Sequence, residues 1–229
     1  MRRIAGVLLS AISMLAPSTR AQTQSAPPGN VAKPATTLSK TVVRITGRIE
    51  GVLLPINATG FLVGVPDSRL PGGAFFTYLV TNRHVAQAIF PNAEGKPETH
   101  NILEMEAILN LKEIVDGTRA HSIDLPPRGR MHWYFPEDKS IDLAVTSIPL
   151  EDAYDVTSIE PGFFFTPDVW AKFGIGPGDR VLTCGYFLYY PGAHQFQPII
   201  REGNSRWFLT TSRASLLGVM LGCILPTFI

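Results

Sequence analysis

From Thr41 onward the sequence is a series of short runs rich in β-branched and aromatic residues, separated by Gly, Pro, Asn and Asp. The runs are TVVRITGRI, GFLVGV, FFTYLVT, DLAVTSI, DRVLTCGYF and QPIIR. Such side chains pack well on a pleated sheet, whereas the residues between the runs favour turns. Many short strands that follow one another in this way predict an all-β fold of the barrel or sandwich type.

Helices are expected in few places. VAQAIF, directly after His84, is compatible with a turn or two of helix, and ILEMEAILNL over residues 102–111 has an apolar spacing that fits helix or strand. We favour a strand for 102–111. Polar or Pro-rich stretches at 66–73, 91–101 and 116–130 are predicted to be loops between strands.

The N-terminus has the three-part pattern of a signal peptide. Met1-Arg2-Arg3 precedes an apolar stretch over 4–16, and small and polar residues follow up to Ala21. A membrane anchor is the alternative, but the stretch is shorter than the roughly 20 residues that cross a bilayer. We therefore expect removal of residues 1–21 and export to the periplasm or the exterior. Residues 22–40 are rich in Pro, Ser, Thr and Ala and are predicted to be a flexible leader.

Several function classes lack support in the sequence. The 20 Lys+Arg balance 19 Asp+Glu without a long block of either sign, so a nucleic-acid partner is not expected. The five histidines include no H-E-x-x-H, no cysteine pair has zinc spacing, and the glycines do not form a phosphate-binding loop. We predict no metal and no cofactor. Cys184 lies in an apolar run and is interpreted as a buried hydrophobe that could pair only with Cys223.

Two polar residues lie at the ends of apolar runs. The run YLVTNRHVA leads straight into His84, and SIDLAV places Asp142 at the start of another run. Taken singly, each has a structural explanation, a satisfied core histidine or a strand-edge carboxylate. A half-buried carboxylate nevertheless needs a partner. In hydrolysis by a hydroxyl nucleophile, an imidazole takes the proton and a carboxylate fixes its tautomer. The sequence thus predicts His84 as base and Asp142 as its orienting group.

At these residues the chain resembles the trypsin-like serine peptidase family. TGFLV at 59–63 is similar to the family's G-[ST]-G-F-[LV] strand, with Ala58 in place of the first glycine, and TNRHV and DLAV are similar to its histidine and aspartate motifs. GDRV at 178–181 with Gly185-Tyr186 is similar to an early strand of the second barrel. The resemblance implies a peptidase domain over 41–203, a double β-barrel with a first barrel over about 41–140 and a partial second over about 141–203. It further implies a serine endopeptidase acting on polypeptides.

The family's nucleophile motif, G-[DNF]-S-G-[GS]-P, does not occur in the chain. The nearest candidate is Ser205 in EGNSRW, where Arg206 and Trp207 replace the glycines that would aim N–H groups at an oxyanion. PIIREG at 198–203 resembles a strand that precedes the serine in the family, so Ser205 is interpreted mainly as a turn residue. The alternative function is an inactive peptidase-like module that binds extended peptides by strand addition.

Residues 204–229 are predicted to be a divergent apolar tail. They contain no charged residue after Arg213, and they are interrupted by Pro226. Our hypothesis is a premature or frame-shifted end, with no stable membrane span expected.

Overall fold

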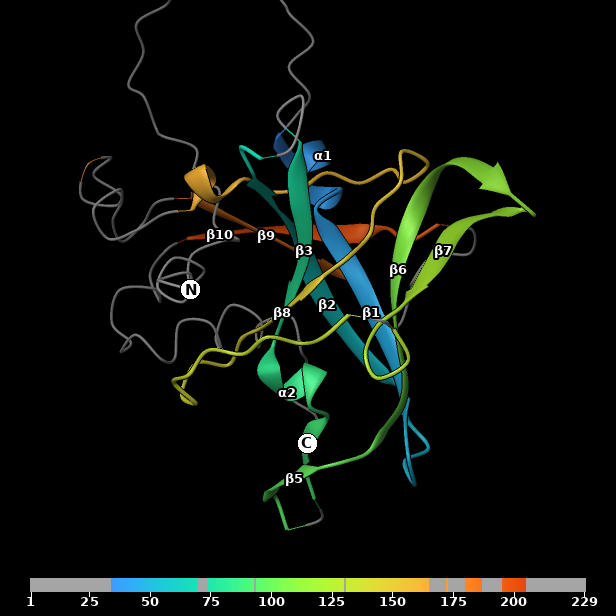
Figure 1. Ribbon diagram of the computed structural model, residues 1–229, viewed down its shortest axis with the longest axis vertical. Coiled ribbons are helices and arrows are strands. Elements are labelled where there is room, and N and C mark those ends of the chain that lie inside the picture. The colour runs from blue at the N-terminus through green and yellow to red at the C-terminus, as the bar shows by residue number, and fades with distance from the viewer. Residues whose placement is uncertain are drawn as a thin grey trace, which may run out of the picture.

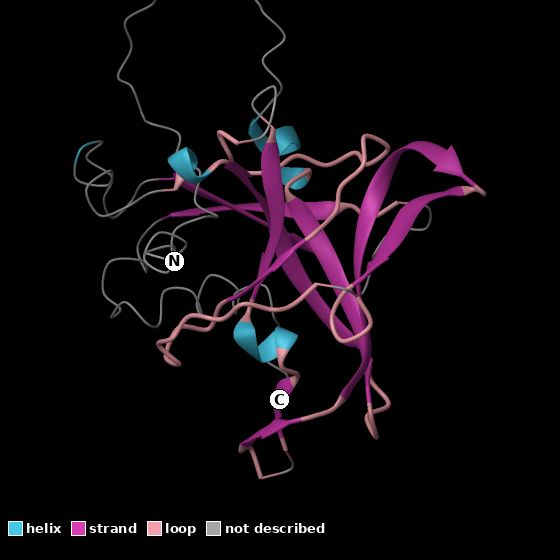
Figure 2. Cartoon of the chain, viewed as in Figure 1, coloured by secondary structure: helices cyan, strands magenta, loops and turns pink. Residues whose placement is uncertain are grey.

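The computed structural model describes residues 34–69, 74–92, 94–129, 131–164, 172, 180–186 and 195–204. The predicted signal peptide, most of the predicted leader, Ser205 and the rest of the apolar tail therefore lie outside the described residues. Most of the described chain is strand, with short helices only, as Figure 2 shows. The prediction of an all-β fold is confirmed.

Six antiparallel strands form the main sheet, in the order β7–β6–β1–β2–β3–β8 (Figure 1). Their bounds are β1 Val42–Ile49, β2 Ile56–Pro66, β3 Phe75–Thr81, β6 Ile102–Val115, β7 Thr118–Asp124 and β8 Ala144–Ser147. In the described pairings β7 and β8 are the two edges of this sheet and do not pair with each other. The described strands therefore make an open sheet.

The remaining elements are small. Two hairpins pair β4 (Ile89–Pro91) with β5 (Pro97–Thr99) and β9 (Arg180–Tyr186) with β10 (Pro198–Asn204). The helices are α1 (Pro34–Ser39), α2 (Arg83–Ala86) and the 3-10 turn η3 (Pro161–Phe163). None of the helices in the described part of the chain is both long and apolar enough to cross a membrane.

β2 is buried on both faces over most of its length, which explains why the run GFLVGV is continuously apolar. Leu62 of β2 and Leu79 of β3 pack in one hydrophobic cluster with Ile45 of β1. Their strand neighbours point to the opposite face, where Phe61 and Val80 pack in a second cluster. Successive side chains of a strand alternate between faces, so one run such as GFLVGV serves two cores.

The segment after β8 crosses the main sheet and forms backbone hydrogen bonds with β6, with β2 and with Lys40, just ahead of β1. Asp155 N–H donates to Asn110 O of β6 at 2.8 Å, Thr157 N–H to Lys40 O at 3.0 Å, and Ile159 N–H to Leu62 O of β2 at 2.9 Å. β8 itself begins after residue 140, where the resemblance placed the end of the first barrel, and it pairs with β3. Residues 144–159 thus belong to the same packed unit as β1–β3.

The hairpin of β9 and β10 packs against the start of β1. Tyr186 Oη donates to Val42 O at 3.2 Å, and the buried Cys184 and Leu38 share a cluster with these two residues. Asn110 of β6 holds the segment before β10 through two bonds with the backbone of Phe196, at 2.7 and 2.9 Å. The interpretation of Cys184 as a buried hydrophobe is confirmed, with 1% of it exposed.

Three segments test the expected element types. Residues 102–111 form a strand, β6, as predicted. The expected loop at 116–130 instead contains β7, whose polar side chains conceal a strand because it lies at the sheet edge, where its residues are half-buried or exposed. The end of the predicted leader, residues 34–39, forms α1 because Leu38 is buried against β1 and β9.

Candidate active site

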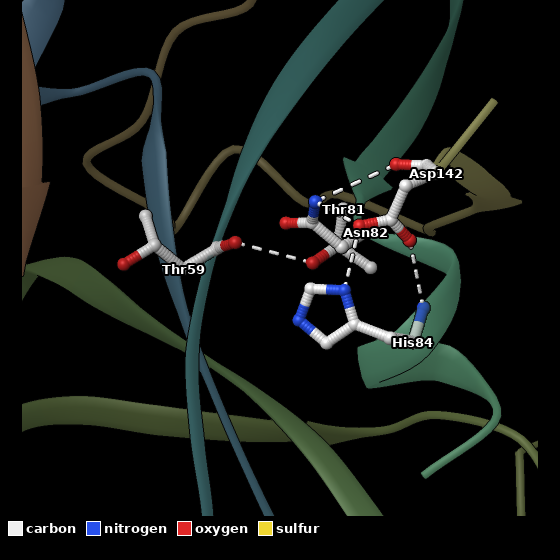
Figure 3. Close-up of polar contacts among 5 residues, drawn as sticks. All are labelled: Thr59, Thr81, Asn82, His84 and Asp142. Carbon is white, nitrogen blue, oxygen red and sulfur yellow. Dashed lines mark hydrogen bonds and ion pairs between the residues drawn. The ribbon is translucent and has the colours of Figure 1, made fainter. Parts of the chain in front are cut away.

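His84 is positioned by the exit from strand β3. The strand ends at Thr81, and helix α2 begins two residues later with Arg83 and His84. Thr81 is fully buried and its hydroxyl donates to Thr59 O at 3.1 Å (Figure 3). Val85, the residue after His84, is buried in the first cluster. Buried residues thus precede and follow the segment Arg83-His84, while the His84 side chain itself remains 32% exposed.

Asp142 is positioned by the entry to strand β8. Leu143 is buried in the second hydrophobic cluster with Phe61 and Val80. The register of β3 with β8 places Thr81 opposite Ala144. Asp142, two residues before Ala144, thus reaches the same end of the sheet as His84. This pairing brings together two residues that are 58 positions apart in the sequence.

The carboxylate of Asp142 makes two contacts with His84, drawn in Figure 3. Oδ1 accepts the backbone N–H of His84 at 2.9 Å, and Oδ2 lies 2.6 Å from the ring atom Nδ1. An ionised carboxylate only accepts hydrogen bonds, so this contact requires the proton on Nδ1. The other ring nitrogen, Nε2, points away from Asp142 in Figure 3. The neutral imidazole then has a free lone pair on Nε2, the arrangement of a general base.

The surroundings favour the ionised form of Asp142. Half-burial alone would raise the pKa of this carboxyl group, but the hydrogen bonds from the His84 ring and backbone N–H outweigh it. The attraction to the His84 ring and a hydrogen bond from the Asn82 amide act in the same direction. Together they lower the pKa of Asp142 to about 2. Asp142 is thus a fixed negative charge at neutral pH.

Arg83 ties α2 to the segment that leads into Asp142. Its Nη2 donates to Pro136 O, and its guanidinium lies 5.4 Å from the ring centre of Phe135. Tyr134 in the same segment exchanges two backbone hydrogen bonds with Val145 of β8, at 2.7 and 2.9 Å. The approach to Asp142 is thus anchored to both elements that carry the candidate site.

Comparisons with protein-family models, curated proteins and solved structures found no match to this chain. What the pair can do follows from its own geometry. A histidine whose Nδ1–H is bound to a carboxylate, and whose Nε2 carries the lone pair, can accept a proton from a hydroxyl group. The same geometry allows the protonated ring to return that proton to a leaving group.

The structure describes two of the three predicted catalytic residues. His84 and Asp142, predicted as a pair, lie in direct contact. Ser205, the candidate nucleophile, lies outside the described residues. Among the described residues no group of three or more His, Cys, Asp or Glu side chains could hold a metal ion. Sequence reasoning missed Asn82, whose amide contacts Asp142; its only signal was its place two positions before the histidine.

Proposed function

We propose that His84 and Asp142 are the base and the orienting carboxylate of an exported serine endopeptidase of the trypsin-like type, which hydrolyses peptide bonds in polypeptides. The observation that carries this proposal is the double contact of Asp142 with His84, to the backbone N–H and to ring Nδ1. The motif order in the sequence and the placement of the pair at the rim of an all-β core support it. The proposed fold is the family's double barrel, with β9 and β10 in the second barrel.

In the proposed reaction, a serine hydroxyl attacks the carbonyl carbon of the scissile peptide bond. His84 Nε2 takes the hydroxyl proton as the new C–O bond forms, and the imidazolium gives it to the amine as the C–N bond breaks. A water molecule then attacks the carbonyl carbon of the acyl-serine ester, and His84 takes its proton and returns it to the serine oxygen. The ester bond breaks, and the new carboxylic acid end of the substrate leaves. Asp142 stays ionised throughout and stabilises the positive ring. Ser205 is the candidate for this serine.

The first test is His84-dependent hydrolysis by the full chain. Cleavage of an unfolded, quenched-fluorescent protein substrate should be lost by about a thousandfold or more in His84→Gln. His132→Gln is the matched control, because His132 is an exposed histidine in the segment before β8, and it should leave the rate unchanged. Hydrolysis that survives His84→Gln would contradict the proposed role.

The second test locates the nucleophile. A fluorophosphonate probe reacts with activated serines, and mass spectrometry identifies the labelled residue. Labelling at Ser205 that is lost in both Ser205→Ala and His84→Gln would make Ser205 the nucleophile and remove its interpretation as a turn residue. Labelling at another serine would assign the role there.

The alternative function is an inactive module that binds extended peptides, and the absence of G-[DNF]-S-G-[GS]-P from the sequence favours it. In the described pairings β7 is an edge strand of the main sheet, the kind of position at which an extended peptide can add as a further strand. This alternative predicts no hydrolysis and no probe labelling, together with peptide binding that is equal in the wild type and His84→Gln. Binding measured by fluorescence anisotropy with a labelled extended peptide separates the two functions.

A further inference from the structure

Asn82 is a buried polar residue between β3 and α2. Only 4% of it is exposed, and a buried amide is costly unless its donors and acceptor find partners. It occupies the N-cap position of α2, with φ −77° and ψ 148°. Asparagine at an N-cap normally accepts a hydrogen bond from the N–H two or three residues on. Here its side chain makes no such capping bond.

The amide of Asn82 is directed at Asp142 instead, as Figure 3 shows. Nδ2 donates to Asp142 Oδ2 at 2.9 Å and lies 3.5 Å from the backbone oxygen of the same residue. Both partners are acceptors only, so the amide must present its NH₂ group to them. The His84 N–H, which an N-cap side chain at Asn82 could have accepted, goes to Asp142 Oδ1. Asp142 therefore caps α2, and Asn82 supports Asp142.

Three N–H groups now define the orientation of one carboxylate. The His84 backbone N–H binds Oδ1, while His84 Nδ1 and Asn82 Nδ2 share Oδ2. Without the amide, the contacts that hold the carboxylate among the described residues would all come from His84, so its rotation about the Cβ–Cγ bond would be less restricted. The ring would then lose a fixed acceptor for its Nδ1 proton.

We propose that Asn82 is a positioning residue that fixes the Asp142 carboxylate and thereby holds His84 in the tautomer with its proton on Nδ1. It acts through Asp142 and does not contact the reacting atoms. This inference rests on the proposed function, because it assigns Asn82 a part in preparing the general base. A residue that merely filled space would affect stability and leave the tautomer unchanged.

The experiment measures the tautomer of His84 in the full chain by NMR with ¹⁵N-labelled histidine, at a pH where the ring is neutral. The His84 signals are identified by their loss in His84→Gln. Asn82→Leu keeps a similar volume and removes the donor. It should lower the ratio of the Nδ1–H to the Nε2–H form by about tenfold, the size expected for one hydrogen bond to a charged acceptor. The Nδ1 proton should also exchange faster with water.

Further variants separate positioning from packing. Asn82→Gln keeps an amide donor and should recover a ratio closer to the wild type than Asn82→Leu does. Thr81→Val is the matched control, because Thr81 is the residue next to Asn82. The change removes the buried hydrogen bond from Thr81 to Thr59 O and leaves the contact between His84 and Asp142 in place. It should lower stability and leave the ratio unchanged. If Asn82→Leu does not fold, Asn82→Ala takes its place, since its short side chain removes the donor without placing a bulky apolar group against the carboxylate.

Two results would overturn the inference. One is an unchanged tautomer ratio in a folded Asn82→Leu or Asn82→Ala protein. The other is an equal change in Thr81→Val, which would assign the effect to general loosening at the end of β3. The ratio is read without substrate, so a chain that hydrolyses no peptide can still confirm the role of Asn82. Conversely, His84-dependent hydrolysis can persist when the tautomer result fails.

Discussion

At the scale of single residues, Asp142 carries the strongest electrostatic feature of the candidate site. Its pKa is lowered to about 2 because donors from His84 and Asn82 outweigh the effect of half-burial. A carboxyl group that ionises more readily in the folded chain than in the unfolded chain stabilises the fold wherever it is ionised. That stabilisation is complete above the ordinary pKa of aspartate and is lost as the pH falls toward 2.

This linkage predicts how Asp142→Asn behaves in acid. Between about pH 4 and pH 2 the wild type should lose stability that the variant lacks, so the difference in unfolding free energy between them should shrink by on the order of 1 kcal/mol, allowing for partial solvent screening. Urea unfolding at about pH 6 and about pH 3 measures it. Asp152→Asn, at an exposed position, is the control and should track the wild type. A difference that does not change with pH would contradict the linkage.

The two principal residues could be predicted from the sequence because a histidine and an aspartate stand next to apolar runs, and an imidazole with a carboxylate is the pairing that hydrolysis by a hydroxyl nucleophile needs. Asn82 could not be assigned in this way. Its neighbours Thr81 and Arg83 are polar too, so no contrast marks it, and its contact crosses 60 positions of sequence. Only the pairing of β3 with β8 reveals which acceptor its amide meets.

At the scale of elements, β2 depends on a glycine in the TGFLV run. A Cβ at Gly60 would lie 2.9 Å from Val80 O and 2.7 Å from Leu79 Cδ1. Gly60→Ala should therefore force β2 away from β3 and destabilise the protein by about 2 kcal/mol. Gly162→Ala is the control, because nothing lies within 4 Å of a Cβ there, and it should stay within about 0.5 kcal/mol of the wild type. Equal unfolding midpoints in urea for the two variants would refute this account.

Arg83 links α2 to the segment before Asp142 through Pro136 O and the Phe135 ring. Arg83→Met keeps the aliphatic stem and removes both contacts. We expect the amides of Ser140 and Ile141, which bond to Asp138, to exchange with deuterium several-fold faster in this variant. Arg69→Met, which removes an exposed partner of Asp67, should leave these amides unaffected. Unchanged exchange in Arg83→Met would show that β8 alone holds the segment.

Strands were predicted correctly where the apolar residues of a run are also the residues that the fold buries. β1, β2, β3 and β6 are central in the sheet, and the buried apolar residues of their runs predict strands. β7 is a strand for a reason outside its own residues: β6 supplies its hydrogen bonds, and its exposed edge tolerates polar side chains. α1 likewise depends on a distant contact, the burial of Leu38 against Cys184 and Tyr186. Tertiary partners of this kind leave no local signal.

At the scale of the whole molecule, Cys184 reports on the docking of the β9–β10 hairpin. Burial raises the pKa of its thiol to about 12, so it should react with a thiol reagent only when local opening exposes it. Tyr186→Phe removes the bond to Val42 O, which is worth about 1 kcal/mol. Labelling of Cys184, measured by mass spectrometry in a Cys223→Ser background, should become about fivefold faster. Tyr134 is 64% exposed, so the control variant Tyr134→Phe should label at the unchanged rate. Equal labelling rates in the parent protein, Tyr186→Phe and Tyr134→Phe would argue against this docking contact.

The main sheet also dictates when the site can form during folding. The β1–β2 and β2–β3 pairings are local hairpins, whereas β8 reaches β3 only after the chain has closed a loop that includes β4 to β7. Closing such loops costs chain entropy before any contact repays it, and folds rich in distant pairings fold slowly. His84 directly follows the β2–β3 hairpin, whereas Asp142 reaches it only when β8 pairs with β3. We therefore expect a newly made chain to pair its first strands before the contact between His84 and Asp142 forms, so that the candidate site is completed later than the sheet around it.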